Sequence, residues 1–166
     1  EPHEYEQLER LITGDYTTEE RILLDVEVIK EDGSKHYLAV NDAVVARGQL
    51  SKTIDLHLTL DGDEISKYRA DGLLFSTPTG STAYSLSAVC PHSLFSRSVL
   101  FSGESELSVH VKIPEECCCV LTIDGEKNVP VLATDRVVIR KSDLKLKLAL
   151  LHNRNFYKLL NEKLKE

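Results

Sequence analysis

Short segments in which apolar and polar residues alternate recur along most of this chain, and they limit the folds open to it. The alternation is clear at residues 24–28, 54–60 and 107–113. A period of two is typical of β-strands with one buried face. Turn signals such as Asp32-Gly33 separate the segments at a spacing of roughly 8–12 residues, which is typical of antiparallel sandwiches. The pattern therefore predicts a mainly β fold, an antiparallel β-sandwich with short flanking helices.

The two ends of the chain depart from this period. Tyr5, Leu8 and Leu11 lie at helical spacing ahead of Gly14, which favours a helix that ends there. Near the other end, Asn155 precedes residues with an apolar stripe at helical spacing. We therefore divide the chain into an N-terminal helical segment at residues 1–20, a β-sandwich domain at residues 21–152 and a C-terminal helix at residues 153–166.

Charge and composition exclude several classes of function. The net charge of −7 argues against a protein that binds the phosphate backbone of nucleic acids. No apolar run approaches the roughly 20 residues of a membrane span and no signal peptide is evident, so we expect no membrane partner. Cys117, Cys118 and Cys119 are contiguous and cannot converge on one metal from a strand. The sequence predicts reduced cysteines and a cytoplasmic protein.

The stretch with the richest chemistry runs from residue 71 to residue 88. Residues 73–75 predict a buried strand, residues 76–82 are all small or turn-forming, and residues 83–88 can begin a helix. A loop that leads into a helix can hold a phosphate or a sugar on its unpaired N–H groups. A capped loop without a ligand is the alternative. The stretch has no Gly-Lys-Ser/Thr ending, so it is not a Walker phosphate loop.

Residues 71–88, DGLLFSTPTGSTAYSLSA, closely resemble the signature of the NAD kinases, which phosphorylate NAD at its 2′-hydroxyl to make NADP. Asn41-Asp42, at the end of another predicted strand, resembles the Asn-Glu pair of the family, with a side chain one methylene shorter at Asp42. In that family a β-sandwich follows an α/β domain with a Gly-Gly-Asp-Gly motif. This sequence lacks that motif and begins with Glu1, so the resemblance implies the C-terminal, dinucleotide-binding half of a longer protein.

The resemblance also implies which residues bind the dinucleotide. Asn41 and Asp42 would hold the adenosine ribose, since an amide beside a carboxylate can accept from paired hydroxyls. Tyr84 would stack on a ring of the ligand, and Asp71 would orient the carboxamide. No residue is expected to be catalytic or to bind a metal. The expected binding residues are Asn41, Asp42, Lys52, Arg69, Asp71, Thr82, Ala83, Tyr84, Ser85, Leu86, Ser87 and Glu126.

Several of these residues have a simpler interpretation. Asn41-Asp42 alone is also typical of a strand end, and Arg69 could pair with Asp71 on one strand face. Glu126 stands at a turn where the family commonly has Gln, and a hairpin turn with a solvent-facing Glu explains it equally well. The sequence also departs from the family after Ala88, where a segment of the usual pattern is absent. We interpret that junction as a deletion or as residues missing from the sequence.

The function that we expect is therefore the NAD-binding domain of an NAD kinase. The whole enzyme would transfer the γ-phosphate of ATP to NAD with a divalent metal such as Mg²⁺, and this fragment alone would be inactive. The resemblance implies a homodimer or homotetramer in which a neighbouring subunit completes the pocket, and the α/β domain as a missing partner. The alternatives are an inactive NAD(P)-binding or assembly module, and a lipid kinase of the diacylglycerol type.

Overall fold

The computed structural model describes residues 2–48, 53–77, 84–91, 98–113 and 119–151. The chain forms two compact units: Ile22–Leu146 is one, and Glu1–Arg21 with Lys147–Glu166 is the other. The predicted domain bounds at residues 20 and 152 stay a prediction. The larger unit carries the fold and every expected site residue that the structure describes.

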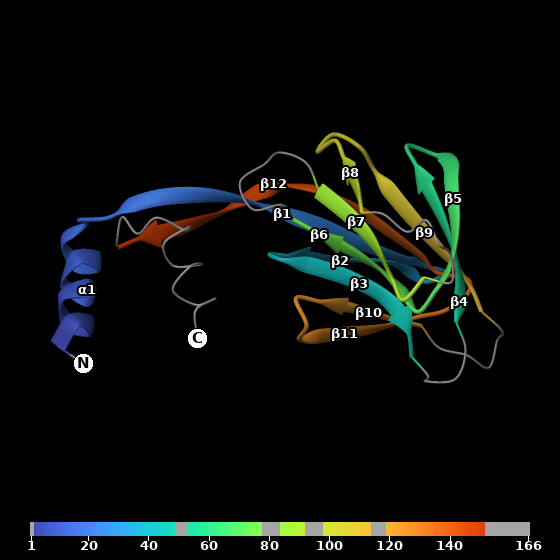
Figure 1. Cartoon of the computed structure of the whole chain (residues 1–166), viewed down its shortest axis with the longest axis horizontal. Helices are drawn as coiled ribbons and strands as arrows, with labels where there is room; N and C mark the ends of the chain where they lie inside the picture. Colours follow the sequence, from blue (N-terminus) through green and yellow to red (C-terminus); the bar gives the residue numbers. More distant parts are fainter. Residues whose placement is uncertain (1, 49–52, 78–83, 92–97, 114–118, 152–166) are drawn as a thin grey trace. The chain divides into compact units, whose positions relative to one another are not determined.

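The described strands form two six-stranded sheets, and every pairing recorded between neighbouring strands is antiparallel (Figure 1). Sheet A has the order β2-β1-β12-β9-β4-β5, and its strands are β1 (Thr17–Lys30), β2 (Gly33–Ala39), β4 (Ile54–Leu60), β5 (Asp63–Ala70), β9 (Leu107–Lys112) and β12 (Arg136–Leu150). Sheet B has the order β11-β10-β3-β6-β7-β8, and its strands are β3 (Asp42–Arg47), β6 (Gly72–Ser76), β7 (Tyr84–Val89), β8 (Val99–Phe101), β10 (Cys119–Ile123) and β11 (Lys127–Val131). The predicted mainly β, antiparallel sandwich is confirmed.

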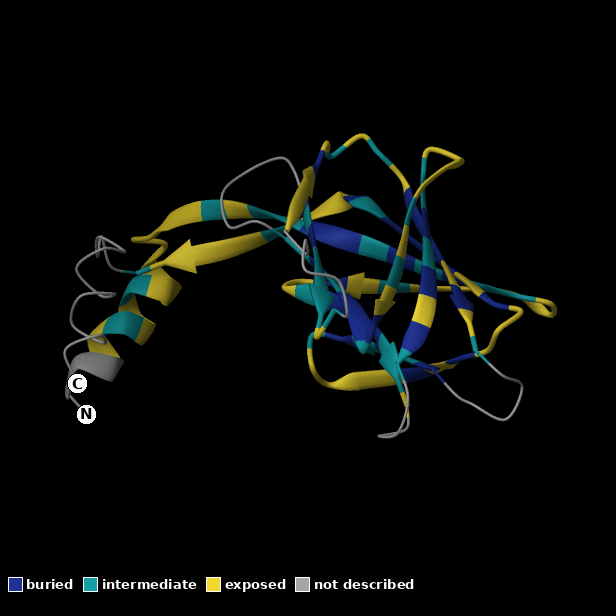
Figure 2. Ribbon diagram, turned by 45° about the vertical axis from the view of Figure 1, so that its right-hand side comes forward, coloured by how far each residue is buried: buried dark blue, intermediate teal, exposed yellow. Residues whose placement is uncertain are grey.

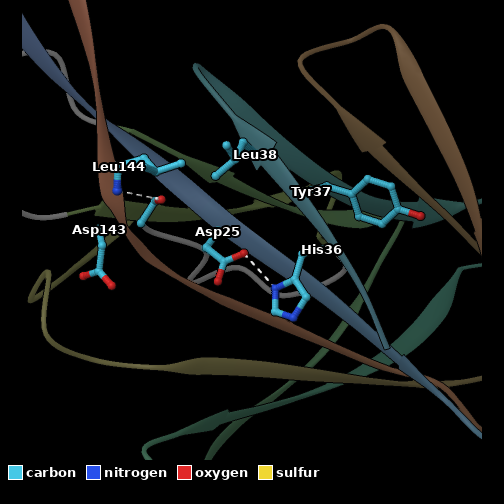
Figure 3. A pocket seen from close by; sticks show the side chains of 7 residues that line it. Asp25, His36, Tyr37, Leu38, Asp143 and Leu144 are labelled. Atoms are coloured by element: carbon cyan, nitrogen blue, oxygen red, sulfur yellow. Dashed lines mark hydrogen bonds and ion pairs between the residues drawn. The ribbon is translucent and has the colours of Figure 1, made fainter. Parts of the chain in front are cut away.

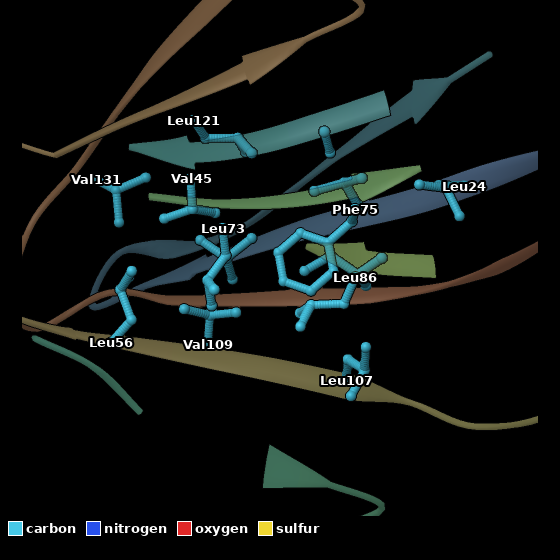
Figure 4. Packing of buried hydrophobic residues seen from close by; sticks show 14 of the residues in the cluster. Leu24, Val45, Leu56, Leu73, Phe75, Leu86, Leu107, Val109, Leu121 and Val131 are labelled. Atoms are coloured by element: carbon cyan, nitrogen blue, oxygen red, sulfur yellow. The ribbon is translucent and has the colours of Figure 1, made fainter. Parts of the chain in front are cut away.

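Alternate residues of both sheets form the core. In β6, Leu73 and Phe75 are fully buried, whereas Leu74 and Ser76 lie on the outer face and are partly exposed. Side chains such as Leu56 contribute from the other sheet, and Figure 4 shows these apolar groups packed together. Each fully buried side chain of this size stabilises the fold by about 1.5–3 kcal/mol. Figure 2 shows the same alternation as buried and exposed residues along the strands.

One glycine marks an unusually close approach between two strands of sheet B. A Cβ atom built on Gly72 would lie 2.6 Å from the carbonyl oxygen of Val45 and 2.9 Å from the Cβ of Ala46. The register places Gly72 opposite Ala46 on one side and Val89 on the other. Backbone this close to backbone leaves no room for a side chain at position 72.

The predicted N-terminal helix is present. Helix α1 spans Pro2–Thr13 and ends at Gly14, whose φ of 77° is the left-handed conformation that favours glycine at this position. The guanidinium of Arg10 donates to the backbone carbonyl of Leu151 and contacts Asp15 at 2.9 Å. The helix predicted at residues 153–166 lies outside the described residues.

The prediction that residues 83–88 begin a helix is wrong, because strand β7 occupies Tyr84–Val89. Tyr84 and Leu86 are buried while the serines between them face outward, which is a period of two. Pairing with β6 and β8 satisfies the backbone of this segment. The strand also runs without a break through the junction after Ala88, so the departure from the family pattern falls inside a regular element.

Candidate functional site

The topology brings several expected site residues to one end of sheet B. Strand β3 lies between β10 and β6, and its first residue, Asp42, is paired with Ser76 at the end of β6. Ser76 is in turn paired with Ser85 at the start of β7. Ala43 is paired with Ile123, the last residue of β10. We call this edge the Asn41 end of sheet B, because Asn41 directly precedes β3.

The outer face of sheet B carries hydroxyls and small apolar groups near this end. The serine oxygens of Ser76 and Ser85 are 2.6 Å apart, and those of Ser87 and Ser98 are also 2.6 Å apart. Leu74, which is paired with Ser87 in the register, is only partly exposed. An apolar floor with a few fixed polar groups is the usual composition of a small-molecule site.

Residues 40–42, which we call the corner, precede and begin β3, and hydrogen bonds hold their backbone from both sides. The N–H groups of Val40, Asn41 and Asp42 donate to the carboxylate of Asp124 at 2.8, 2.7 and 3.0 Å. From the other side, the N–H of Thr77 donates to the carbonyl of Asn41 at 2.9 Å, and its hydroxyl donates to the carbonyl of Val40 at 2.8 Å. The side chain of Asn41 emerges from this corner into solvent.

The carboxyl of Asp42 has an unusual environment. Partial burial and the nearby Asp124 carboxylate both raise the pKa of Asp42 above its ordinary value. A carboxylate held beside a second carboxylate weakens the fold, and such arrangements cluster at functional sites. This environment fits a binding residue and is also compatible with the strand-end pair that is the alternative.

Tyr84 does not present its ring to a ligand. Its side chain is fully buried, its ring stacks on Phe101 with centroids 6.0 Å apart, and its hydroxyl donates to the carbonyl of Ser105 at 2.6 Å. Burial, followed by the charges of Asp61 and Glu106, raises the pKa of the hydroxyl well above its ordinary value. The expected stacking role of the ring is wrong, because the ring is part of the core. Leu86 faces inward in the same way.

Asp71 lies at the opposite end of sheet B. Its carboxylate contacts the guanidinium of Arg47 at 3.0 Å, and its carbonyl accepts from the backbone N–H of Arg47 at 2.9 Å. The five residues of β6 separate it from the Asn41 end by roughly 16 Å, given about 3.3 Å per residue. Arg69 is on β5 of sheet A, with its side chain 72% exposed and 3.9 Å from Asp55. The alternative in which Arg69 pairs with Asp71 is therefore wrong, since Asp71 pairs with Arg47.

Glu126 lies in the turn between β10 and β11, at the Asn41 end. Its N–H donates to the carbonyl of Ile123, and its side chain is exposed. This geometry fits both the binding interpretation and the simple hairpin turn. The remaining expected residues, Lys52, Thr82 and Ala83, lie outside the described residues.

A shallow pocket of about 450 Å³ lies on the outer face of sheet A and contains none of the expected site residues (Figure 3). In it the ring of His36 is 3.1 Å from the carboxylate of Asp25. The residues that line it are Asp25, His36, Tyr37, Leu38, Ser142, Asp143 and Leu144. Two carboxylates and an exposed histidine suit a solvated surface better than the binding of an anionic dinucleotide.

Three residues that shape the corner and its opposite end are not among the expected binding residues: Asp124, Thr77 and Arg47. The first two stand beside segments that the sequence marks as turns, but their partners are distant in the chain. In the part of the chain that the structure describes, no group of three or more His, Cys, Asp or Glu side chains could hold a metal ion. No helix among those residues is long and apolar enough to cross a membrane.

Solved structures share this architecture. Yeast NADH kinase complexed with NADH superposes with a TM-score of 0.86 at 18% identity, covering 99% of this chain and 55% of that one. An NAD kinase from Archaeoglobus fulgidus in complex with ATP gives a TM-score of 0.72 at 21% identity, covering 96% of this chain and 64% of that one. At these identities the likeness concerns the fold, so the chain is a β-sandwich domain of the type found in these kinases.

Sequence comparison is more specific. The family model of the ATP-NAD kinase C-terminal domain matches residues 40–151, and this chain belongs to that family. The NAD kinase of Natranaerobius thermophilus is 36% identical over 174 residues, covering 95% of this chain and 60% of the relative. That of Magnetococcus marinus is 35% identical over 179 residues, covering 96% and 58%. The chain thus spans about three-fifths of the length of the curated relatives that it matches.

Proposed function

We propose that this chain is the dinucleotide-binding domain of an NAD kinase, which transfers the γ-phosphate of ATP to the 2′-hydroxyl of the NAD adenosine ribose. Membership of the ATP-NAD kinase C-terminal domain family and the NAD kinase relatives support this over a lipid kinase. The observation that carries the proposal is the braced corner at Asn41 and Asp42, beside a row of serine hydroxyls. Cys90 is exposed and Cys119 lies in the core, where its thiol donates to the carbonyl of Ala46, and reduced cysteines of this kind suit a reducing cytoplasm.

The corner offers the chemistry that a ribose needs. The Asn41 amide can donate and accept, while the Asp42 carboxylate accepts from both hydroxyls of a diol. The hydroxyls of Ser85 and Ser87 face the same outer surface, and Leu74 supplies an apolar floor for a base. Because its ring is buried, Tyr84 contributes to the site only through its backbone, next to the neighbouring Thr82 and Ala83 that the family resemblance assigns to the pocket.

Titration calorimetry with NAD tests this proposal. Asn41→Ala in the full-length protein is expected to weaken NAD binding by about tenfold or more, since it removes hydrogen bonds to the ligand. Asn128→Ala is the matched control, because Asn128 is an exposed asparagine on β11 of the same sheet that accepts from Thr122 at 2.8 Å. Equal affinities in the wild-type protein and Asn41→Ala would contradict the assignment. NAD binding without any NADP formation by the full-length protein would favour the inactive binding module instead.

The separation of Asp71 from Asn41 supports a pocket that two subunits share. Asp71 and Asn41 lie at opposite ends of sheet B, and a neighbouring subunit could bring its own Asp71, Arg69 and Lys52 to the corner. We therefore propose a homodimer or homotetramer. Asn41→Ala and Asp71→Ala should each lack activity alone, and mixing them should restore part of it, because a mixed dimer has one intact site. Absence of restoration, or a monomer by light scattering with normal activity, would contradict the shared pocket.

Phosphoryl transfer requires groups beyond those described here. It depends mainly on positioning and on neutralising charge, tasks that ATP, a divalent metal such as Mg²⁺ and an α/β domain would share. Among the described residues of this chain, no group of three or more His, Cys, Asp or Glu side chains is suited to that metal. Purified 1–166 with ATP and magnesium should form no NADP, and detectable NADP would overturn this division of labour.

A further inference from the structure

Two Asp-Gly turns of the sandwich share one backbone form. Asp61-Gly62 joins β4 to β5 in sheet A, and Asp124-Gly125 joins β10 to β11 in sheet B. The two aspartates have φ values of 51° and 50°, and the glycines also have positive φ. In each turn the aspartate N–H donates at 2.9 Å to the carbonyl of an adjacent strand segment, Glu106 in one case and Asp42 in the other. The turns are therefore a natural matched pair.

The carboxylates of the two turns have different contacts. That of Asp61 accepts one backbone N–H, from Glu106 at 2.8 Å. That of Asp124 accepts three consecutive N–H groups, those of residues 40–42, at 2.7 to 3.0 Å. Successive N–H groups that converge on one anion form a compact anion site, and hydrogen bonds to an ionised acceptor are stronger than neutral ones. Asp124 thus does more than close a hairpin.

The contacts fix the backbone from which the ligand-facing side chains emerge. Asp124 holds the N–H groups of the corner, while Thr77 holds the carbonyls of Val40 and Asn41. A side chain on a rigid backbone loses less conformational freedom when it binds a ligand, so preorganisation increases affinity. Without Asp124, the described hydrogen bonds to the segment between β2 and β3 would be those from Thr77, which directly follows β6.

We propose that Asp124 is a positioning residue for the dinucleotide site, holding Asn41 and Asp42 in the geometry that binds the adenosine ribose. It acts through the backbone of the corner and does not touch the ligand itself. This inference rests on the proposed function, because it assumes that Asn41 and Asp42 bind the ribose.

The same contact has an electrostatic consequence. The Asp124 carboxylate, together with burial, raises the pKa of Asp42. On the other side of Asp42 lie Ser76, the last residue of β6, and Thr77 directly after it, neither of which titrates in this range. Replacement of Asp124 by a neutral residue should therefore lower the pKa of Asp42. Replacement of Asp61 should leave it unchanged, since Asp61 contacts a different strand.

The experiment compares Asp124→Asn with Asp61→Asn in the full-length protein. Both variants lose a carboxylate that braces a hairpin, so both should melt earlier. Only Asp124→Asn should weaken NAD binding by about tenfold or more, while Asp61→Asn should bind within about twofold of the wild type. Carboxyl-carbon NMR should show a lower pKa for Asp42 in Asp124→Asn alone. If Asp124→Asn does not fold, Thr77→Val removes one side-chain brace of the same corner and should weaken binding severalfold.

The outcomes separate this inference from the proposed function. If the wild-type protein binds NAD and Asn41→Ala weakens it, but Asp124→Asn binds as Asp61→Asn does, the positioning role is wrong and the proposed function stands. If both turn variants weaken binding equally and the pKa of Asp42 does not move, general destabilisation explains the loss and the inference is again wrong. If the wild-type protein binds no dinucleotide, the proposed function fails and the inference fails with it.

Discussion

The outer faces of the two sheets have opposite chemistry, although both belong to one sandwich. On sheet A, the Arg140 guanidinium contacts the carboxylates of Asp25, Glu27 and Glu106 at 2.6 to 3.1 Å. On sheet B, the outward residues of β6 and β7 near the Asn41 end are serines and Leu74, with Asp42 beside them on β3. The core is built from the inward-facing side chains of each strand, so the chemistry of the outward-facing side chains can differ between the two sheets. The charged face interacts with water, and the hydroxyl-bearing face fits a bound ligand.

The largest expected effect tests the division between inward and outward residues within β7. Tyr84→Ala should lower the free energy of unfolding by roughly 3–5 kcal/mol, as for other buried aromatic residues, because it removes the ring packed on Phe101. Urea unfolding measures the loss, and Ser85→Ala, one residue further on the outer face, should change stability by less than about 0.5 kcal/mol. If the Tyr84→Ala protein is as stable as the wild type but does not bind NAD, the prediction is wrong and the ring of Tyr84 contributes to NAD binding.

The next prediction compares how a glutamate on each outer face changes the affinity for NAD. Ser87→Glu places bulk and negative charge on the outer face of sheet B and should weaken NAD binding by about tenfold or more, which is about 1.4 kcal/mol. Thr59→Glu makes a matched change on the outer face of sheet A and should leave the affinity within about twofold. Titration calorimetry on both variants decides the matter. Similar losses in the two would erase the proposed difference between the faces.

A smaller effect concerns the stability cost of Asp42. Since its pKa is raised in the folded protein, its ionised form opposes folding at neutral pH, and the penalty disappears as the pH falls below the ordinary carboxyl range. Asp42→Asn should therefore raise the free energy of unfolding at pH 7 by less than about 1 kcal/mol, with no gain in acid. Thermal melts across pH measure this gain, and a loss of stability at pH 7 would contradict it.

The smallest effect belongs to the charged face. Partial burial, Arg136 and His57 lower the pKa of His110, so the unfolded chain takes up this proton at a higher pH than the folded protein does. The contribution of His110 is present above its ordinary pKa of 6.5 and is lost as the pH falls through the lowered value. His110→Gln should flatten the decline in stability below that pH and leave NAD affinity unchanged. An unaltered decline would contradict this prediction.

The sandwich could be predicted from the sequence because alternation at residues 24–28, 54–60 and 107–113 carries its own structural meaning. The β7 strand is not predicted, because residues 83–88 follow a turn-forming segment and are interpreted as the start of a helix, although buried Tyr84 and Leu86 alternate with serines. The contacts that build the corner could not be predicted in this way. Asp124 and Asn41 are 83 residues apart in sequence, and only the order of strands in sheet B brings them together.

The partners of Asp71 illustrate the same limit. Sequence proximity suggested Arg69, two residues away, because neighbours on one face of a strand often pair. The chain instead turns from sheet A to sheet B at this point, which directs Arg69 and Asp71 to different surroundings. Arg47, 24 residues distant, takes the carboxylate because β3 is paired with β6. Spacing along a strand predicts a shared face only while both residues stay within that strand.

The tight contact at Gly72 has a consequence for how evolution can change this domain. Any side chain at that position would collide with the carbonyl of Val45, so substitution would have to push two central strands of sheet B apart. Selection would therefore keep glycine at position 72 in a descendant that has lost all affinity for a dinucleotide. Descendants of this domain would retain Gly72 as a record of shared ancestry, and retention of the glycine would say nothing about whether a lineage still binds its ligand.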